Sequence, residues 1–213
     1  MFLCLATTTL TALTAVKPRG TVAPGAVVVA PTQEYNHFLR KATVFVLDDG
    51  DDGTIGVNLG SPTMLTIGEA AANVVTGDLG DNKLWMGGEH GGTGAVMLHA
   101  VPGLAGSKKI GDSDIFVGGI AQARQLVDDG QKRPADFKFF FNVAKWPKGL
   151  LQDMVDEGRW LAFDNVPTSV VLDQDPDLDV PGLWSSFRKL NARLRKQEKE
   201  QITDDDERHE EEV

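Results

Sequence analysis

The chain has 213 residues, 41% hydrophobic and 24% charged, so it can bury the core of one domain without disulfides or metal ions. Its formal net charge of −10 argues against a nucleic-acid binder, because affinity for phosphates needs a surplus of Lys and Arg. The composition also excludes collagen, coiled coil and disorder of the whole chain. Cys4 is the only cysteine, which excludes disulfide frameworks and zinc knuckles from the rest of the chain.

The first segment of the chain has the composition of an organelle-targeting presequence. Residues 1–33 contain no Asp or Glu, and they combine several threonines with Lys17 and Arg19. We therefore assign residues 1–21 to a presequence-like segment, with a frayed or cloned terminus as the alternative. A secretory signal fits less well, because no charge precedes the apolar stretch, and nothing in the chain resembles a transmembrane helix.

Short β-branched runs bounded by turn residues predict strands at the start of the domain. Residues 26–30 read Ala-Val-Val-Val-Ala before a proline, which predicts a buried opening strand. Residues 43–47 and 54–59 are predicted to pair as a hairpin, because the Asp-Gly steps between them favour the positive φ of tight turns. The acidic tip lacks the position-12 glutamate of an EF-hand, so we interpret it as a solvated turn.

The middle of the chain is divided by glycines into short elements. Thr66 and Glu69 have the spacing of a capping box, which predicts a helix over residues 70–75. Short strands are predicted at residues 84–86, 96–99 and 114–117. Helical spacing then predicts a short helix from Ile120 to Gly130.

The second half alternates strands and helices without a regular βαβ pattern. Residues 137–143 gather aromatics like a central strand, and a helix is predicted from Pro147 to Gly158. Residues 160–163 and 169–172 are predicted as closing strands. A final amphipathic helix presents a buried face and a basic solvent face; its apolar residues are Leu183, Phe187, Leu190 and Leu194. These patterns predict an α+β fold with one domain over residues 22–194.

A charged tail over residues 195–213 follows the domain. Residues 204–212 carry seven acidic residues against one arginine and supply −6 of the net charge. A run of like charge this dense predicts a disordered end that stays in solvent.

The glycine-rich segment 87–94 is the best candidate for an exposed ligand loop, although a glycine-rich turn is the simpler interpretation. It lacks the Lys-Ser/Thr of a Walker loop, and a strand rather than a helix follows it. The histidines have no zinc-binding spacing, and the common hydrolase motifs are missing. The candidate site residues are Gly87, Gly88, His90, His99 and Trp146. We expect His99 to be a hydrogen-bonded core residue, and we predict no cofactor and no metal.

Several motifs follow one another in a fixed order. They are Pro-Gly-Ala-Val-Val-Val-Ala-Pro at 24–31, the hairpin of 38–59, Leu-Trp-Met-Gly-Gly at 84–88, Val-Met-Leu-His at 96–99, the aromatic segment 139–146 with the helix and Trp-Leu strand to residue 161, and Trp184. In this order they resemble the YqgE/AlgH family, a bacterial and plastid group often described only as a domain of unknown function. The resemblance covers about residues 22–194.

The resemblance implies an α+β domain whose sheet curls into a partly closed, barrel-like shape with helices outside. It supplies no catalytic residue set. Two segments depart from the family pattern: Asn-Val-Ala-Lys at 142–145 precedes the tryptophan, and Asn36-His37 stands where Asp-Pro is common. These changes bear on whether a ligand site shared by the family is retained.

The function that we favour is a non-catalytic interaction or regulatory module, an accessory subunit of a larger assembly in a plastid, in the stroma or on a membrane complex reached through partners. A cytoplasmic location is the alternative. Arg188, Lys189 and Arg193 are the candidate partner surface. The rival hypothesis is a small-molecule-binding protein or an enzyme that uses the 87–94 loop.

Overall fold

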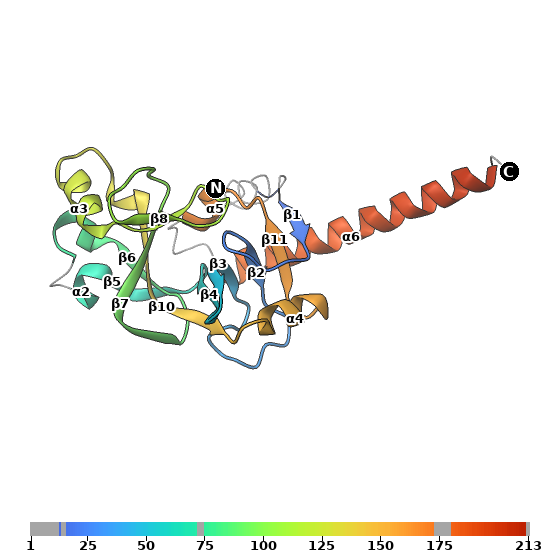
Figure 1. Ribbon diagram of the computed structural model, residues 1–213, viewed down its shortest axis with the longest axis horizontal. Helices are drawn as coiled ribbons and strands as arrows, with labels where there is room; N and C mark the ends of the chain where they lie inside the picture. Colours follow the sequence, from blue (N-terminus) through green and yellow to red (C-terminus); the bar gives the residue numbers. More distant parts are fainter. Residues whose placement is uncertain (1–12, 14–15, 72–74, 173–179, 212–213) are drawn as a thin grey trace, which may run out of the picture.

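The computed structural model describes residues 13, 16–71, 75–172 and 180–211; residues 92–93, 180–181 and 202–211 are described by their backbone alone. Its strands form one sheet with the order β1-β11-β2-β3-β4-β10-β7-β9-β8, and β5 and β6 branch from β10 (Figure 1). The strands are β1 (Lys17–Arg19), β2 (Val27–Val29), β3 (Thr43–Gly50), β4 (Gly53–Asn58), β5 (Pro62–Thr66), β6 (Lys83–Met86), β7 (His90–His99), β8 (Ser107–Lys109), β9 (Phe116–Gly118), β10 (Phe137–Trp146) and β11 (Leu161–Asp164).

Helices cover the sheet and close its connections, which confirms the α+β prediction. They are α2 (Ile67–Ala70), η2 (Gly77–Asp81), α3 (Ile120–Asp128), η3 (Pro134–Asp136), α4 (Leu150–Asp156), α5 (Thr168–Leu172) and α6 (Val180–Glu211). In the described part of the chain, no helix is both long enough and apolar enough to cross a bilayer. The predicted capping box is present: Thr66 Oγ1 accepts from the Glu69 N–H, and Glu69 Oε2 accepts from the Thr66 N–H. The helix that it starts is shorter than predicted, and residues 72–74 lie outside the described residues.

Strand β10 is the central strand that its aromatic run predicts. Its first half pairs in parallel with β6 and antiparallel with β7, and its last residues pair with β4. The register between β10 and β7 shifts between Phe141 and Val143, where Asn142 has a φ of 61°. This bulge divides β10 into two parts that face different neighbours.

The predicted hairpin is confirmed and extends further into the acidic tip than the sequence suggested. Gly50 pairs with Gly53, so Asp51 and Asp52 alone form the turn between β3 and β4. The φ of Gly53 is 102°, a conformation that residues with a Cβ rarely adopt.

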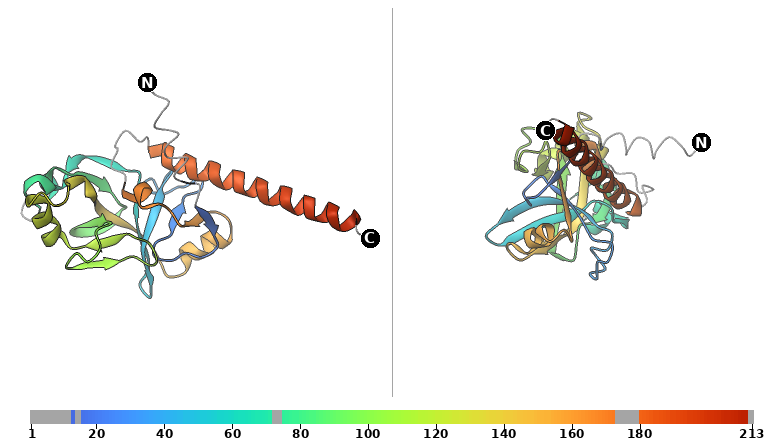
Figure 2. Two further views of the ribbon diagram at one scale, coloured as in Figure 1. Left: turned by 90° about the horizontal axis from the view of Figure 1, so that it is seen from above. Right: turned by 90° about the vertical axis from the view of Figure 1, so that its right-hand side faces the viewer.

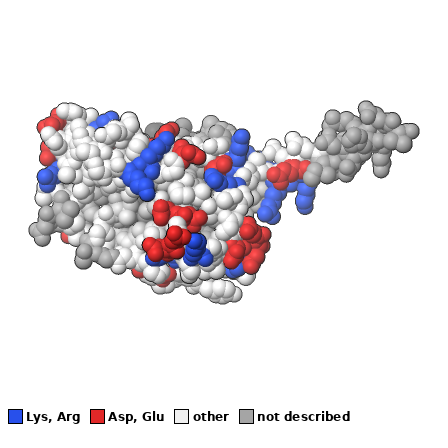
Figure 3. Space-filling view, viewed as in Figure 1, with Lys and Arg blue, Asp and Glu red and all other residues white. Residues whose placement is uncertain are grey.

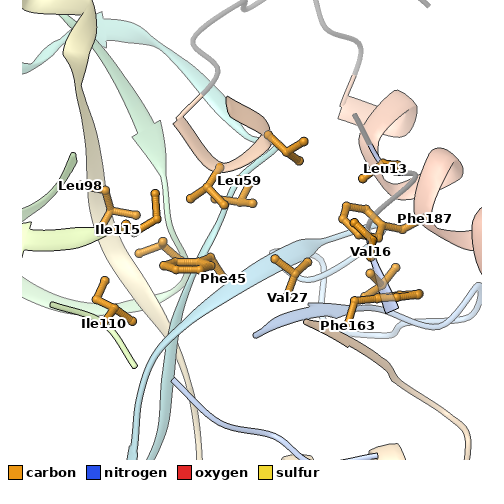
Figure 4. Packing of buried hydrophobic residues seen from close by; sticks show 14 of the residues in the cluster. Leu13, Val16, Val27, Phe45, Leu59, Leu98, Ile110, Ile115, Phe163 and Phe187 are labelled. Atoms are coloured by element: carbon orange, nitrogen blue, oxygen red, sulfur yellow. The ribbon is translucent and has the colours of Figure 1, made fainter. Parts of the chain in front are cut away.

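The core is built from both sides of the sheet. Figure 4 shows one part of it, in which Phe163 and Phe187 lie close to Leu13 and Val16, and Val27 and Phe45 belong to the same cluster. The Phe163 and Phe187 rings are 5.1 Å apart between centroids. Their contact fixes the start of α6 against β11.

The start of the domain lies earlier than the boundary predicted at residue 22. Lys17–Arg19 form the edge strand β1, which pairs antiparallel with β11, and Leu13 and Val16 are buried in the core. The presequence-like composition of residues 1–21 therefore overlaps with structural residues. Composition could not indicate this, because β1 acquires its partner from a segment about 145 positions later in the chain.

Residues 169–172 form helix α5 rather than the predicted closing strand. The Val170 N–H donates to the Pro167 carbonyl at 2.9 Å, so the proline begins the helical turn. Val170 and Val171 are both buried. A short apolar run with two adjacent buried valines does not distinguish a strand from a buried helical turn, which explains the difference.

Helix α6 also differs from its prediction, because its backbone stays helical from Val180 to Glu211 and leaves the domain as a long projection (Figures 1 and 2). The sequence predicted a charged tail from residue 195 that ends in a disordered acidic run over residues 204–212. Residues 195–201 are rich in Lys, Arg, Glu and Gln, which are good helix formers and extend the helix that Phe187 and Leu190 anchor. We call residues 195–211 the α6 arm.

Candidate functional site

The glycines of segment 87–94 lie against the bulge of β10. The Gly87 N–H donates to the Phe141 carbonyl at 2.8 Å, and the Gly87 carbonyl accepts from the Asn58 N–H at 2.9 Å. A Cβ on Gly88 would lie 2.2 Å from both Ala144 N and Val143 C. Packing therefore requires glycine at both positions, because the two backbone segments lie too close together to leave room for a Cβ atom.

Asn142, one of the departures from the family pattern, occupies the bulge itself. Its left-handed φ is one that asparagine tolerates better than most residues. A Cβ on Gly91 would lie 2.2 Å from Asn142 Oδ1, so the side chain of Asn142 covers Gly91. The bulge and the glycines facing it form one structural unit.

An exposed polar cluster stands beside this unit. Asn36 Nδ2 donates to Glu89 Oε1 at 2.7 Å, and His90 Nδ1 lies 3.9 Å from the same oxygen. On an extended strand Glu89 and His90 would point in opposite directions, but β7 begins only at His90, which lets the two side chains approach. The cluster can present a carboxylate and an imidazole to a polar ligand. Sequence reasoning noted Asn36 and the segment 87–94 separately but could not pair Asn36 with Glu89, since the two residues are 53 positions apart.

His99 is the buried, hydrogen-bonded core histidine that its apolar strand predicts. The Val101 N–H donates to Nδ1 at 3.1 Å, so Nε2 carries the proton and donates to the Gly118 carbonyl at 3.2 Å. Its ring stacks on Phe116. Burial lowers the pKa of His99 below its ordinary value, although its two backbone hydrogen bonds oppose this shift. These contacts fix a neutral imidazole in the interior.

The structure separates the predicted site residues along β10 instead of gathering them. His99 pairs with Phe137 at one end of β10, and His90 pairs with Val143 six positions later. Strand geometry places these two positions about 20 Å apart. Trp146 is buried at the far end of β10, where its ring makes an edge contact with the Trp160 ring, with 5.5 Å between the ring centroids. Only Gly87, Gly88 and His90 share one locality.

The acidic hairpin tip is a surface turn. Lys148 forms an ion pair with Asp51, and Thr54 Oγ1 donates to Asp49 Oδ1 at 2.6 Å. Among the described residues, no three His, Cys, Asp or Glu side chains come together in a group that could hold a metal ion.

The three residues of the candidate partner surface divide into two kinds. Arg188 turns toward the domain, where Nη1 donates to the Ala30 carbonyl at 3.3 Å beside the Trp184 ring. Lys189 and Arg193 are exposed. Trp184 Nε1 donates to the same Ala30 carbonyl at 2.8 Å, which locks the base of α6 to the end of β2.

A polar cavity that sequence reasoning missed lies where three chain segments meet. It has a volume of about 350 Å³, and its lining includes Arg19, Gly25, Gly111, Ser113, Asp164 and Asn165. Arg19 Nη1 lies 4.0 Å from Asp164 Oδ2. Asn165 has a φ of 54°, one of the left-handed values that are uncommon outside glycine. Only the fold reveals this cavity, because its residues come from distant parts of the chain.

The comparisons with known proteins agree with this fold. The AlgH-like family matches residues 27–190. A UPF0301 protein of Thermobifida fusca is 32% identical over 76% of this chain and 83% of its own length, and one of Chlorobaculum parvum is 26% identical over 70% and 79%. A solved structure from Corynebacterium diphtheriae has a TM-score of 0.61 at 18% identity, covering 78% of this chain and 85% of that chain.

The solved structure of the AlgH protein from Pseudomonas aeruginosa has a TM-score of 0.55 at 13% identity and covers 72% of this chain and 82% of that one. At such low identity the two solved structures support the fold. The family match spans most of the chain and bears out the resemblance found in its ordered motifs. The chain belongs to the AlgH-like family, a family of unknown function.

Proposed function

We propose that the protein is a non-catalytic interaction or regulatory module that serves as an accessory subunit of a larger assembly, and that the α6 arm is its docking element. The observation that carries this proposal is the projection of α6 beyond the domain (Figure 2). A helix of 17 residues is about 25 Å long, so the arm reaches well away from the sheet.

The base of α6 gives the arm a fixed direction. Phe187 and Leu190 are buried, and two donors from α6 reach the Ala30 carbonyl. Beyond Leu194, each residue from 195 to 201 is exposed. The rigid base therefore presents the exposed extension to a partner in a defined orientation.

The charges on the arm can determine which partner it binds. Basic and acidic side chains stand together where α6 leaves the domain (Figure 3), and the sequence of the arm ends in the acidic run of residues 204–212. Charges on an exposed surface raise association rates and discriminate between partners more than they add affinity. The arm also lies beyond residue 190, where the family match ends. Its partner is therefore expected to be specific to this chain rather than common to the family.

The proposed setting is a plastid, with the cytoplasm as the alternative. The acid-free, threonine-rich opening supports import into an organelle. Leu13 and Val16 belong to the core, so a removable presequence would have to end before Leu13. Sequencing the N-terminus of the protein isolated from its source tests this setting: we expect a new N-terminus before Leu13, and a protein that still begins at Met1 contradicts import with cleavage.

Affinity capture from a gentle extract tests the docking role. The full chain, a chain ending at Leu194 and a K189E/R193E variant serve as baits, and companions are quantified by mass spectrometry. The matched control is K108E/K109E, which makes the same charge change on the exposed residues of β8. We expect the truncation and K189E/R193E to lose companions that the control retains. Equal recovery by all four baits contradicts the proposal.

The exposed cluster of Asn36, Glu89 and His90 supports one alternative, a small-molecule-binding protein or an enzyme that uses the 87–94 loop. A metabolite screen by thermal shift tests it with E89Q and H90A, since both side chains are exposed and can be changed without disturbing the core. A ligand that stabilises the wild-type protein and neither variant favours this alternative. Equal shifts in all three proteins place the ligand elsewhere.

A further inference from the structure

One face of α6 carries charge in a regular pattern. Seven positions follow one another at steps of four, three, four, four, three and four residues, and at 100° per residue they fall within a stripe about 80° wide. We call them the charged stripe: Lys189, Arg193, Lys196, Glu200, Asp204, Glu207 and Glu211. Its first three positions are basic and its last four are acidic.

The charged stripe is separate from the face that packs on the domain. Leu183, Phe187, Leu190 and Leu194 form the packed face, which is rotated from the stripe by roughly 110°. Lys189, Arg193 and Lys196 are exposed. The stripe is therefore open to a partner from Lys189 to Glu200, beside the domain and along the first part of the arm.

The order of the charges does not suit a helix that stands alone. Glu211 lies in the last turn of α6, where negative charge is unfavourable because it faces the negative end of the helix dipole. Lys196 forms an ion pair with Glu200 at 3.5 Å, with lysine first, which is the less favourable orientation for an i, i+4 pair. The arm would gain from a partner that brings positive charge to its end and negative charge to its base.

A second copy of the same stripe provides this arrangement. In an antiparallel pair centred on Glu200, Lys189 faces Glu211, Arg193 faces Glu207 and Lys196 faces Asp204, and the two-fold axis repeats each pair. The two Glu200 residues meet at the axis, each beside its own Lys196. A parallel pair would instead place like charges opposite each other along the whole length.

We infer that the charged stripe of α6 pairs antiparallel with the charged stripe of a second copy, which makes the protein a salt-sensitive homodimer. This goes beyond the proposed function, because it requires no other protein, and it is tested on the purified chain alone. Whether the variants lose companions from an extract tests docking to other proteins, and neither result of that test decides this inference.

Sedimentation velocity of the purified full chain at about 20 mM and about 300 mM NaCl tests the pairing. We expect dimers at low salt and at least about a tenfold rise in the dissociation constant at high salt, since the Debye length falls from about 20 Å to about 6 Å and salt screens the charges. Variant A carries K189E, R193E and K196E, and variant B carries D204K, E207K and E211K. Neither should dimerise alone, but an equimolar mixture of A and B should form a heterodimer.

Two further chains make the test specific. A chain with all six substitutions reverses the stripe and should dimerise again as the wild type does. R195E changes an exposed charge on another face of α6 and should dimerise like the wild type. The inference is overturned if the wild type stays monomeric at low salt, if A or B dimerises as well as the wild type, or if A and B do not associate. Far-UV circular dichroism of each variant checks that its domain is folded.

Discussion

Gly88→Ala should destabilise the protein through a single added methyl group. The Cβ would lie 2.2 Å from the backbone of Val143 and Ala144, about 1.2 Å inside ordinary van der Waals contact. Relief requires a shift of β10, which pairs with three other strands at once. Backbone rather than a flexible side chain must move, so the strain is spread over the centre of the sheet.

We expect Gly88→Ala to lower the free energy of unfolding by about 2–3 kcal/mol, near the upper end of typical overpacking. The loss of chain entropy in the unfolded state offsets up to about 1 kcal/mol of a larger strain. For a domain of this size the fall corresponds to a decrease in Tm of about 4–12 °C. Gly94→Ala is the matched control: it lies in β7 with nothing within 4 Å of its Cβ, so its stability should stay within about 1 kcal/mol of wild type.

Urea unfolding followed by tryptophan fluorescence measures both variants, because three of the four tryptophans are buried. The midpoint of Gly88→Ala should fall while the m-value stays constant. If Gly88→Ala and Gly94→Ala unfold at the same midpoint, then the loop does not lie against β10. The packing explanation of these glycines would then be wrong, and the ligand-loop hypothesis would regain weight.

Three other changes test separate parts of the fold by the same unfolding assay. Because burial lowers the pKa of His99, the unfolded chain binds the proton more readily than the folded chain. Wild-type stability should therefore fall as pH drops below 6.5, by at most about 1.4 kcal/mol per pH unit from this residue. His99→Gln should lose that contribution, and the same pH profile of stability in wild type and variant counts against this explanation. Thr66→Ala removes one half of the capping box and should cost about 1 kcal/mol, whereas no change would show that α2 is held by packing alone. A chain that begins at residue 22 loses buried Leu13 and Val16 and should be less stable by roughly 3–6 kcal/mol. Equal stability would mean that β1 and the residues before it are not part of the folded domain.

The sequence predicted best those elements whose signal is local. Residues 27–29 are β-branched and fully buried, and the turn at Asp51-Asp52 lies between two glycines that permit the reversal. The anchored part of α6 follows from the spacing of Phe187 and Leu190. In each case hydrophobic period or turn chemistry is enough, because neighbours in sequence decide the conformation.

Elements that depend on distant partners escaped prediction. Strand β1 contains Pro18 and two charges, and it is a strand only because β11 offers it an edge. To predict a helix at Val170 and Val171, one would need to know that both side chains are buried by the rest of the fold. Tertiary contacts overrode the local pattern at both places.

The candidate site divides in the same way. His99 could be placed in the core because its strand is apolar, and the structure confirms that interpretation. The role of Gly88 depends on where β10 bulges, which no local pattern specifies. The contact of Asn36 with Glu89 likewise joins two segments that are remote in sequence.

The size of the native protein tests the central claim, that the α6 arm carries the interactions of this chain. A gentle extract of the source cells, expressing either the tagged full chain or a tagged chain ending at Leu194, is separated on a native gel and probed for the tag. We predict that the full chain migrates well above its own mass of 23.0 kDa and that the shortened chain migrates close to its own mass. Migration of both chains at the same position, whether in a complex or alone, would contradict the claim.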